Sequence, residues 1–284
     1  MADVRRTGRL PRRPRSLAVQ VAVGAAALVL VAFLALPFLA LLLRVSLAQL
    51  AARLGDPVVL DALRLSLVTS GAATLIVVLL GLPVAYLLAS REFVGKRVVE
   101  VLIDLPMVLP PTVAGFALLM AFGRMGLLGR SLGALGITLP FTTAGVVLAQ
   151  VFMAVPFFVG PARAGFAGVD RKLLDAAATL RASESHTFFR VILPLAMPSL
   201  VAGMAMSCAR ALGEFGATIT FAGNLPGTTQ TMPLAVYIAL QSDLDAAVVL
   251  SVLLLVMAFG LLLGLRSAPA GWFWNRANAG APGR

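Results

Sequence analysis

Long apolar runs alternate with short polar segments along most of the chain. A transmembrane helix needs about 20 mostly apolar residues to cross roughly 30 Å of hydrocarbon. Six stretches have about that length: 17–43, 65–90, 101–122, 131–162 (from about 143), 191–209 and 246–265. Such runs are too long for the strands of a membrane barrel. The pattern therefore predicts an all-α, polytopic membrane protein with six transmembrane helices.

The third of these spans is unusual because it contains Asp104 near its start and three prolines in the sequence DLPMVLPPTVAG (104–115). Proline has no N–H to donate and clashes with the preceding turn, so we expect this helix to be bent or broken. The bend would either aid packing or let Thr112 and Gly115 face a pathway, and the residues leave both interpretations open.

The remaining segments divide the chain into a basic tail (1–16), a first span with an outside loop (17–60), a membrane domain (61–265) and a second tail (266–284). In the outside loop we expect a short interfacial helix that ends at Gly55 and Pro57. The apolar segment 214–245 is predicted to dip back into the membrane. Trp272 and Trp274 in the second tail are typical of an aromatic anchor at the interface.

The composition excludes an ordinary soluble domain, because 60% of the residues are hydrophobic, 12% are charged and the mean hydropathy is +0.98. The net charge of +11 is explained by topology rather than by nucleic acid. With a cytoplasmic N-terminus, 17 of the 23 basic residues fall on the inside, in 1–16, 90–100, 163–190 and 266–284. We therefore expect both termini in the cytoplasm, the lipid bilayer as surroundings and no nucleic-acid partner.

The residues needed for catalysis or metal binding are scarce. There is one histidine, His186, and one cysteine, Cys208, inside a predicted span. Lys96 and Lys172 are the only lysines, and neither lies in the G-x-x-x-x-G-K-[ST] sequence that holds nucleotide phosphates. We expect no catalytic site, no metal site and no ATP hydrolysis by this chain alone.

The stretch DAAATLRASESHTFFRVILPLAMP (175–198) is the longest mixed polar and apolar segment on the predicted cytoplasmic side. The spacing predicts two short helices with a corner near 181–183, capped by Asp170 and Ser183. Glu184 then lies in the first turn of the second helix, where the dipole favours an acid. Leu173, Ala177 and Leu180 are expected to share one face. Such a face suits a membrane surface or a protein partner.

This stretch resembles the cytoplasmic loop of ABC importer permeases, in which Glu-Ala-Ala is followed three residues on by Gly and later by Ile-x-Leu-Pro. Asp175, Ala176 and Ala177 match the triplet with Asp for Glu, and VILP (191–194) matches the end with Val for Ile. The resemblance implies that 163–194 is the loop that couples to a separate ATPase subunit. The residues expected to form this coupling surface are Asp175, Ala176, Ala177, Leu180, Arg181, Ser183, Phe188, Phe189, Leu193 and Pro194.

Arg181 stands where the family has its glycine. Glycine would suit a corner between two helices because it adopts dihedrals that other residues avoid. Two explanations follow. Either this corner uses ordinary dihedrals, or Arg181 makes a contact with the ATPase that other members lack.

Two further stretches, LPMVLPPTVAGFALLMAFGRMGLLG (105–129) and RALGEFGATITFAGNLPGTTQTMPLAVY (210–237), look like the molybdate branch of these permeases. Sulfate and thiosulfate permeases share the Leu-Gly-Glu-Phe/Tyr-Gly core and stay an alternative. The resemblance, which runs from about residue 60 to 245, implies the fold of a type I ABC importer permease in a bacterial or archaeal inner membrane. It also implies a homodimer, two ATPase subunits that bind ATP and Mg, and an extracytoplasmic molybdate-binding protein. A third reading, an ATP-independent carrier, would require inverted repeats or intramembrane carboxylates, which the spans lack.

Arg210 and Glu214 are spaced i, i+4 and can pair on one helix face, either as part of a pathway or as a structural anchor. Hydroxyl and amide groups are suitable partners for a tetrahedral oxyanion that must also be released. The residues expected to line the translocation pathway or its gate are Pro110, Pro111, Thr112, Arg210, Glu214, Thr218, Thr220 and Asn224.

Overall fold

A computed structural model describes residues 17–267. It has two compact units that join between Ser46 and Leu47. The helical part of the first unit is α1 (Leu17–Leu43), at the position predicted for the first span. Its described side chains are almost all exposed, and Gln20 is the single polar residue in its sequence, so α1 is apolar around nearly its whole circumference. A helix with no polar face is typical of a membrane span. The basic tail and the two tryptophans of the second tail lie outside the described residues.

The second unit is entirely helical over its described residues, as the apolar pattern predicted. Its helices are α2 (Leu47–Leu54), α3 (Pro57–Ser90), α4 (Lys96–Val108), α5 (Pro111–Phe122), α6 (Gly129–Ala134), α7 (Thr143–Ala167), α8 (Arg171–Thr179), α9 (Glu184–Thr187), the π-helix η1 (Phe188–Ile192), α10 (Leu193–Leu212), α11 (Gly216–Phe221), α12 (Met232–Ser242) and α13 (Leu244–Ser267).

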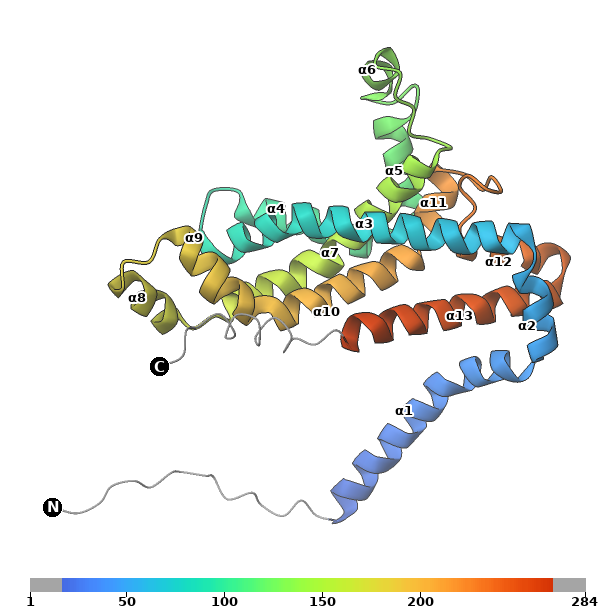
Figure 1. Cartoon of the computed structure of the whole chain (residues 1–284), viewed down its shortest axis with the longest axis horizontal. Coiled ribbons are helices and arrows are strands. Elements are labelled where there is room, and N and C mark those ends of the chain that lie inside the picture. Colours follow the sequence, from blue (N-terminus) through green and yellow to red (C-terminus); the bar gives the residue numbers. More distant parts are fainter. Residues whose placement is uncertain (1–16, 268–284) are drawn as a thin grey trace, which may run out of the picture. The chain divides into compact units, whose positions relative to one another are not determined.

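The centre of this unit is a bundle in which α3, α7 and α10 run side by side and α13 packs along α10 (Figure 1). Their core consists of small and large apolar side chains in contact, among them Ala73, Val77, Phe158 and Leu200. Gly81 lets α3 approach α7 closely, since a Cβ there would lie 2.9 Å from the ring of Phe158. Small residues at such crossings are how helices pack in a bilayer, where lipid supplies no hydrophobic drive.

Five helices are long and apolar enough to cross a membrane: Val19–Leu43, Pro57–Ser90, Thr143–Ala167, Glu184–Leu212 and Leu244–Leu265. They correspond to five of the six predicted spans. The remaining predicted span, the third (101–122), is divided into two helices, so the predicted break is confirmed. Here α4 ends at Val108, Leu109 and Pro110 are extended, and α5 begins at Pro111. The adjacent prolines cause the break, because neither can donate the backbone hydrogen bond that continues a helix.

The break changes the course of the chain. After it, α5 and α6 turn away from the long direction of the bundle (Figure 1). At one end of the bundle lie α8 and α9, and at the other end lie α2 and α12 (Figure 1). The predicted coupling loop and the predicted outside loop therefore occupy opposite ends of the second unit.

The outside loop differs from prediction in one respect. The short helix is present as α2 and ends at Leu54 before Gly55, as expected. Pro57, however, begins α3 eight residues before the predicted start of the second span. The reason is local, because the Asp56 carboxylate accepts a hydrogen bond from the Val58 N–H (3.0 Å) and proline is favoured in the first turn.

Candidate coupling surface and translocation site

The two short helices of the predicted coupling loop are present, with both predicted caps. The Asp170 carboxylate accepts a hydrogen bond from the Lys172 N–H (3.0 Å) at the start of α8. The Ser183 hydroxyl accepts one from the His186 N–H (3.2 Å) at the start of α9. From Glu184 the chain stays helical to Leu212. A capped short helix is thus joined through a corner to a long span.

The corner between them is a Schellman motif. The Ala182 N–H donates to the Ala177 carbonyl (3.0 Å), and the Arg181 N–H donates to the Ala178 carbonyl (2.9 Å). This geometry puts Arg181 at φ +55°, in the left-handed region. The expectation that the corner could use ordinary dihedrals is therefore wrong. Arginine occupies a backbone conformation that favours glycine.

The apolar side chains of this region divide between the core and the surface. Phe188 packs against Tyr86, with ring centroids 4.8 Å apart, and Leu174 packs on the same cluster. Leu180, in contrast, is 82% exposed and Phe189 is 64% exposed. Leu180 was expected to share one helix face with Leu173 and Ala177, but α8 ends at Thr179 and Leu180 belongs to the corner.

The π-helix η1 lies between Phe188 and Ile192, and Leu193 closes it by donating its N–H to the Phe188 carbonyl. Pro194 follows directly and has no N–H to give to a carbonyl one α-turn earlier, which explains a wider turn at this point. Leu193 packs partly on the core, and Pro194 is half-buried. Leu193 and Pro194, which were predicted to belong to the coupling surface, therefore affect the local helix geometry more than they contribute exposed surface.

The charged side chains around the corner have no partner within the described chain. Asp175, Arg181 and Glu184 are exposed, and none of their side chains forms a hydrogen bond or ion pair with another residue of 17–267. Ala176 and Ser183 are exposed beside them. The corner thus presents free charges and two large apolar groups together, as expected of a surface that contacts another protein.

The predicted translocation residues gather around α5 and α11. Glu214 is 1% exposed, and its Oε2 lies 2.6 Å from Arg210 Nη1, which confirms the predicted i, i+4 pair. Its other oxygen, Oε1, accepts a hydrogen bond from the Ala217 N–H (2.7 Å) at the start of α11. One buried carboxylate therefore links the end of α10 to the start of α11.

Helices α5 and α11 touch backbone to backbone through two glycines. A Cβ at Gly115 would lie 2.7 Å from the Ala217 carbonyl oxygen, and one at Gly216 would lie 2.7 Å from the Pro111 ring. The structure therefore brings the 110–112 segment beside 214–220, although about one hundred residues separate them in sequence. We call Arg210, Glu214 and the contact between α5 and α11 the α5–α11 clasp.

The candidate oxyanion-binding side chains differ in availability. The Thr220 hydroxyl donates to the Gly216 carbonyl (2.9 Å), so its proton is already used. Thr112 is exposed at the start of α5. Thr218 Oγ1 and Asn224 Oδ1 are buried without a hydrogen-bond partner among the described residues. Gln150 of α7, which is not among the predicted site residues, is also fully buried, and neither of its side-chain polar atoms has a hydrogen-bond partner within 17–267. Its only signal is a single amide side chain inside an apolar run.

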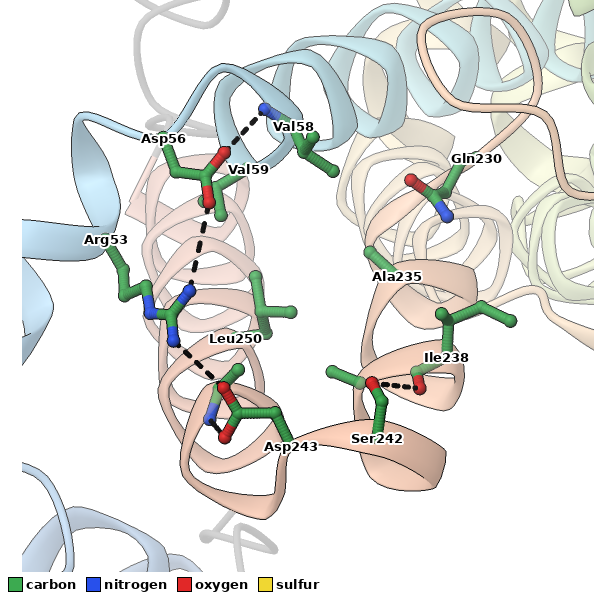
Figure 2. A pocket seen from close by; sticks show the side chains of 12 residues that line it. Arg53, Asp56, Val58, Val59, Gln230, Ala235, Ile238, Ser242, Asp243 and Leu250 are labelled. Atoms are coloured by element: carbon green, nitrogen blue, oxygen red, sulfur yellow. Dashed lines mark hydrogen bonds and ion pairs between the residues drawn. The ribbon is translucent and has the colours of Figure 1, made fainter.

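A separate cavity of about 260 Å³ (Figure 2) lies beside α2 and α12, at the opposite end of the bundle from α8 (Figure 1). Arg53 of α2 pairs there with Asp243 (3.0 Å) and with Asp56 (3.9 Å). Asp243 also accepts a hydrogen bond from the Ala246 N–H (3.0 Å) at the start of α13. That hydrogen bond, followed by the nearby Arg53, holds the pKa of the Asp243 carboxyl below its usual value. The charged side chains at this cavity pair with one another, so they connect α2 to the starts of α3 and α13.

Comparison with known proteins places these features in a family. Residues 78–265 match the family described as binding-protein-dependent transport system inner membrane component. The molybdenum transport system permease protein ModB of Mycobacterium tuberculosis is 46% identical over 239 residues, covering 83% of this chain and 89% of the relative. The probable sulfate transport system permease protein cysT of Chlorokybus atmophyticus is 35% identical over 239 residues, covering 82% of each.

A solved structure shows the same fold at low identity. It is a bacterial ABC transporter involved in the import of the acidic polysaccharide alginate, with a TM-score of 0.71, 13% identity and coverage of 93% of this chain and 96% of the other. That structure shows the fold, whereas the family follows from the match over residues 78–265 and from the 46% identical relative. The chain belongs to the binding-protein-dependent transport system inner membrane components, as a multi-pass inner-membrane permease subunit of an ABC importer whose ATP is hydrolysed by another subunit.

Proposed function

We propose that this permease imports molybdate, with tungstate as a chemically similar second substrate. The observation that carries the proposal is the 46% identity, over 83% of the chain, to a relative named as a molybdenum permease. That alignment is long enough to include both the coupling loop and the α5–α11 clasp.

The chemistry of the clasp supports a small oxyanion. Arg210 is neutralised by Glu214 at 2.6 Å, so a dianion would not meet an unpaired arginine there and be held too tightly. Thr112, Thr218 and Asn224 offer hydroxyl and amide groups that can hydrogen-bond an oxyanion without adding charge. We assign Pro110, Pro111, Thr112, Arg210, Glu214, Thr218, Thr220 and Asn224 to the pathway or its gate on this basis, with Thr220 in a structural role.

We further infer six crossings with both termini in the cytoplasm. The broken pair α4 and α5 would make the third crossing, because Lys96 begins α4 beside the basic 90–100 loop and the chain must return outside before α7. The basic residues support this orientation, since 17 of 23 then lie inside. Within segment 214–245, the stretches 214–224 and 229–236 contain no exposed residue, which suits backbone that re-enters the membrane inside protein.

The assembly we propose contains two copies of this chain, two ATPase subunits and an extracytoplasmic molybdate-binding protein. Residues 163–194 would contact the ATPase through the corner, where free charges stand beside Leu180 and Phe189. ATP and Mg would bind to the ATPase, and this chain is expected to bind no cofactor. Closure of the ATPase pair would move α8, and the continuous helix 184–212 would carry that motion to the clasp.

Sulfate or thiosulfate is the second candidate substrate. It is favoured by one observation, the 35% identity to a probable sulfate permease over 82% of the chain. Sulfate is also a tetrahedral dianion, so the same hydroxyl and amide groups would suit it.

Uptake in reconstituted vesicles tests the substrate. The permease is combined with its ATPase and binding protein, and ATP-driven uptake of labelled molybdate is measured against labelled sulfate. The proposal predicts molybdate uptake that excess tungstate inhibits and excess sulfate does not. Uptake of sulfate with equal or higher efficiency would favour the second candidate, and uptake without the ATPase would contradict both.

The docking assignment has its own test in Asp175→Arg. Asp175 is exposed and unpaired within the described chain, so the variant should insert and fold normally. It should lose ATP-driven uptake, because a cation replaces an anion at the ATPase contact. Transport at the wild-type rate would refute the assignment.

A further inference from the structure

Two residues other than glycine have a positive φ within residues 17–267, Phe141 at +60° and Arg181 at +55°. Side chains with a Cβ are disfavoured in this region because the Cβ crowds the backbone. Arg181 is thus a strained residue, and its identity calls for a reason beyond the backbone geometry, which glycine would satisfy without strain.

The corner does not depend on the arginine side chain. The two hydrogen bonds that form it come from the backbone N–H groups of Arg181 and Ala182. The Arg181 side chain is exposed and has no hydrogen bond, ion pair or ring contact with another described residue. Asp175 and Glu184 lie in the same loop but do not pair with it. The strain is therefore not offset inside the permease.

The surroundings of Arg181 are those of a contact surface. Leu180, the preceding residue, is 82% exposed, and Phe189 in the following helical segment is 64% exposed. Arginine is one of the residue types that dominate binding between proteins, and the exposed Leu180 directly precedes this unpaired guanidinium in the chain. A guanidinium also matches a carboxylate with two parallel hydrogen bonds, which a lysine cannot reproduce.

We propose that Arg181 is a recognition residue for the ATPase subunit and pairs with a carboxylate on that subunit. Leu180 and Phe189 would contact the same subunit nearby. The inference rests on the docking of 163–194 under the proposed function and adds the chemistry of one contact to it. The strain at the corner is then retained because it positions a cation that the partner recognises.

The test measures the affinity of the purified full-length permease for its ATPase subunit, together with the thermal unfolding midpoint of the permease alone. Arg181→Gly should raise the unfolding midpoint, because the strain is removed, and weaken ATPase binding by roughly fivefold or more. Arg181→Lys should recover part of the affinity, and Arg181→Glu should bind more weakly than Arg181→Gly. Arg91→Ala, which removes an exposed cation outside the coupling loop, is the matched control and should bind normally.

The outcomes distinguish the recognition role of Arg181 from the docking of 163–194 on the ATPase, on which that role depends. If wild type binds the ATPase, Asp175→Arg does not, and Arg181→Gly binds as well as wild type, the role of Arg181 is refuted and the docking assignment stands. If Asp175→Arg also binds normally, the docking assignment itself fails. A loss that depends on anionic lipid and is absent in lipid-free detergent would show that Arg181 contacts a membrane surface, which also refutes the proposal.

Discussion

The corner between α8 and α9 and the α5–α11 clasp use charge in opposite ways. At the corner, Arg181 is exposed, strained and unpaired among the described residues. At the clasp, Glu214 is 1% exposed and both of its oxygens are engaged, one by Arg210 and one by the Ala217 N–H. Free charge on a surface supports recognition of a partner, whereas buried charge that is fully paired fixes one arrangement of backbone.

The comparison indicates where substitutions should act. Changes at the corner should alter binding to another subunit and leave the fold intact. Changes at the clasp should alter the fold around α5 and α11 before they alter any contact with a partner. The continuous helix 184–212 joins the two regions, so an effect at one can reach the other only through that helix and its neighbours.

The largest effect is expected for Glu214→Ala. The variant removes the hydrogen bond to Ala217 and leaves Arg210 without its partner, and loss of one member of a buried pair costs about 3–5 kcal/mol. Thermal unfolding in detergent should show a clearly lower midpoint, with loss of uptake. Glu214→Gln is the control, because its amide oxygen can still accept a hydrogen bond from the Ala217 N–H. Its unfolding midpoint should lie between those of the wild type and Glu214→Ala. An unchanged midpoint for Glu214→Ala would mean that the clasp does not hold the fold.

Gly115→Ala should come next. The new Cβ would lie 2.7 Å from the Ala217 carbonyl and 2.8 Å from Thr220 Cβ, and overpacking of this kind costs about 1–3 kcal/mol. The matched control is Gly71→Ala in α3, where a Cβ meets nothing within 4 Å. That control should be neutral or slightly stabilising, since alanine favours a helix more than glycine. Equal midpoints for the two variants would contradict the close approach of α5 and α11.

Arg181→Gly should act in the opposite direction on stability. Removing a side chain from the left-handed region should stabilise the permease alone by about 1 kcal/mol. The unfolding midpoint of the isolated subunit measures this gain. A lower midpoint would show that the arginine stabilises the corner in a way that its contacts do not reveal.

The smallest effect is expected at the exposed pair of Arg53 and Asp243, which provides a reference for the buried pair. The pKa of Asp243 is lowered in the folded protein, chiefly by the Ala246 N–H, so its contribution to stability is present above about pH 4 and is lost as the pH falls through the folded pKa. The protection factors of amides at the start of α13, which are corrected for the intrinsic pH dependence of exchange, should therefore fall as the pH drops below about 4. Asp243→Asn still caps the helix but cannot titrate, so it should remove this dependence.

Much of the fold follows from the sequence because long apolar runs allow few alternatives in a bilayer. Five spans and both caps of the coupling loop were predicted from such local rules. The broken span was predicted as a break but not as a turn away from the bundle, since proline fixes where a helix ends and packing decides where the chain goes next.

The candidate site was less predictable where it depends on contacts between distant segments. The pair of Arg210 and Glu214 follows from i, i+4 spacing, but the second bond of Glu214 and the crossing at Gly115 depend on how α5 meets α11. Helical periodicity places Leu180 on one face with Leu173 and Ala177, but the helix ends at Thr179, and the periodic pattern gives no sign of that end. The positive φ of Arg181 could not be predicted either. Arginine disfavours this conformation, so its presence in the sequence does not indicate a left-handed residue.

The most direct test of the division between corner and clasp is the affinity of the ATPase subunit for two purified variants, Asp175→Arg and Glu214→Gln. The account predicts that Asp175→Arg unfolds at the wild-type temperature but no longer binds the ATPase, whereas Glu214→Gln binds it with wild-type affinity although its clasp is weakened. Wild-type affinity for Asp175→Arg, or loss of binding in Glu214→Gln alone, would contradict the assignment of coupling to the corner.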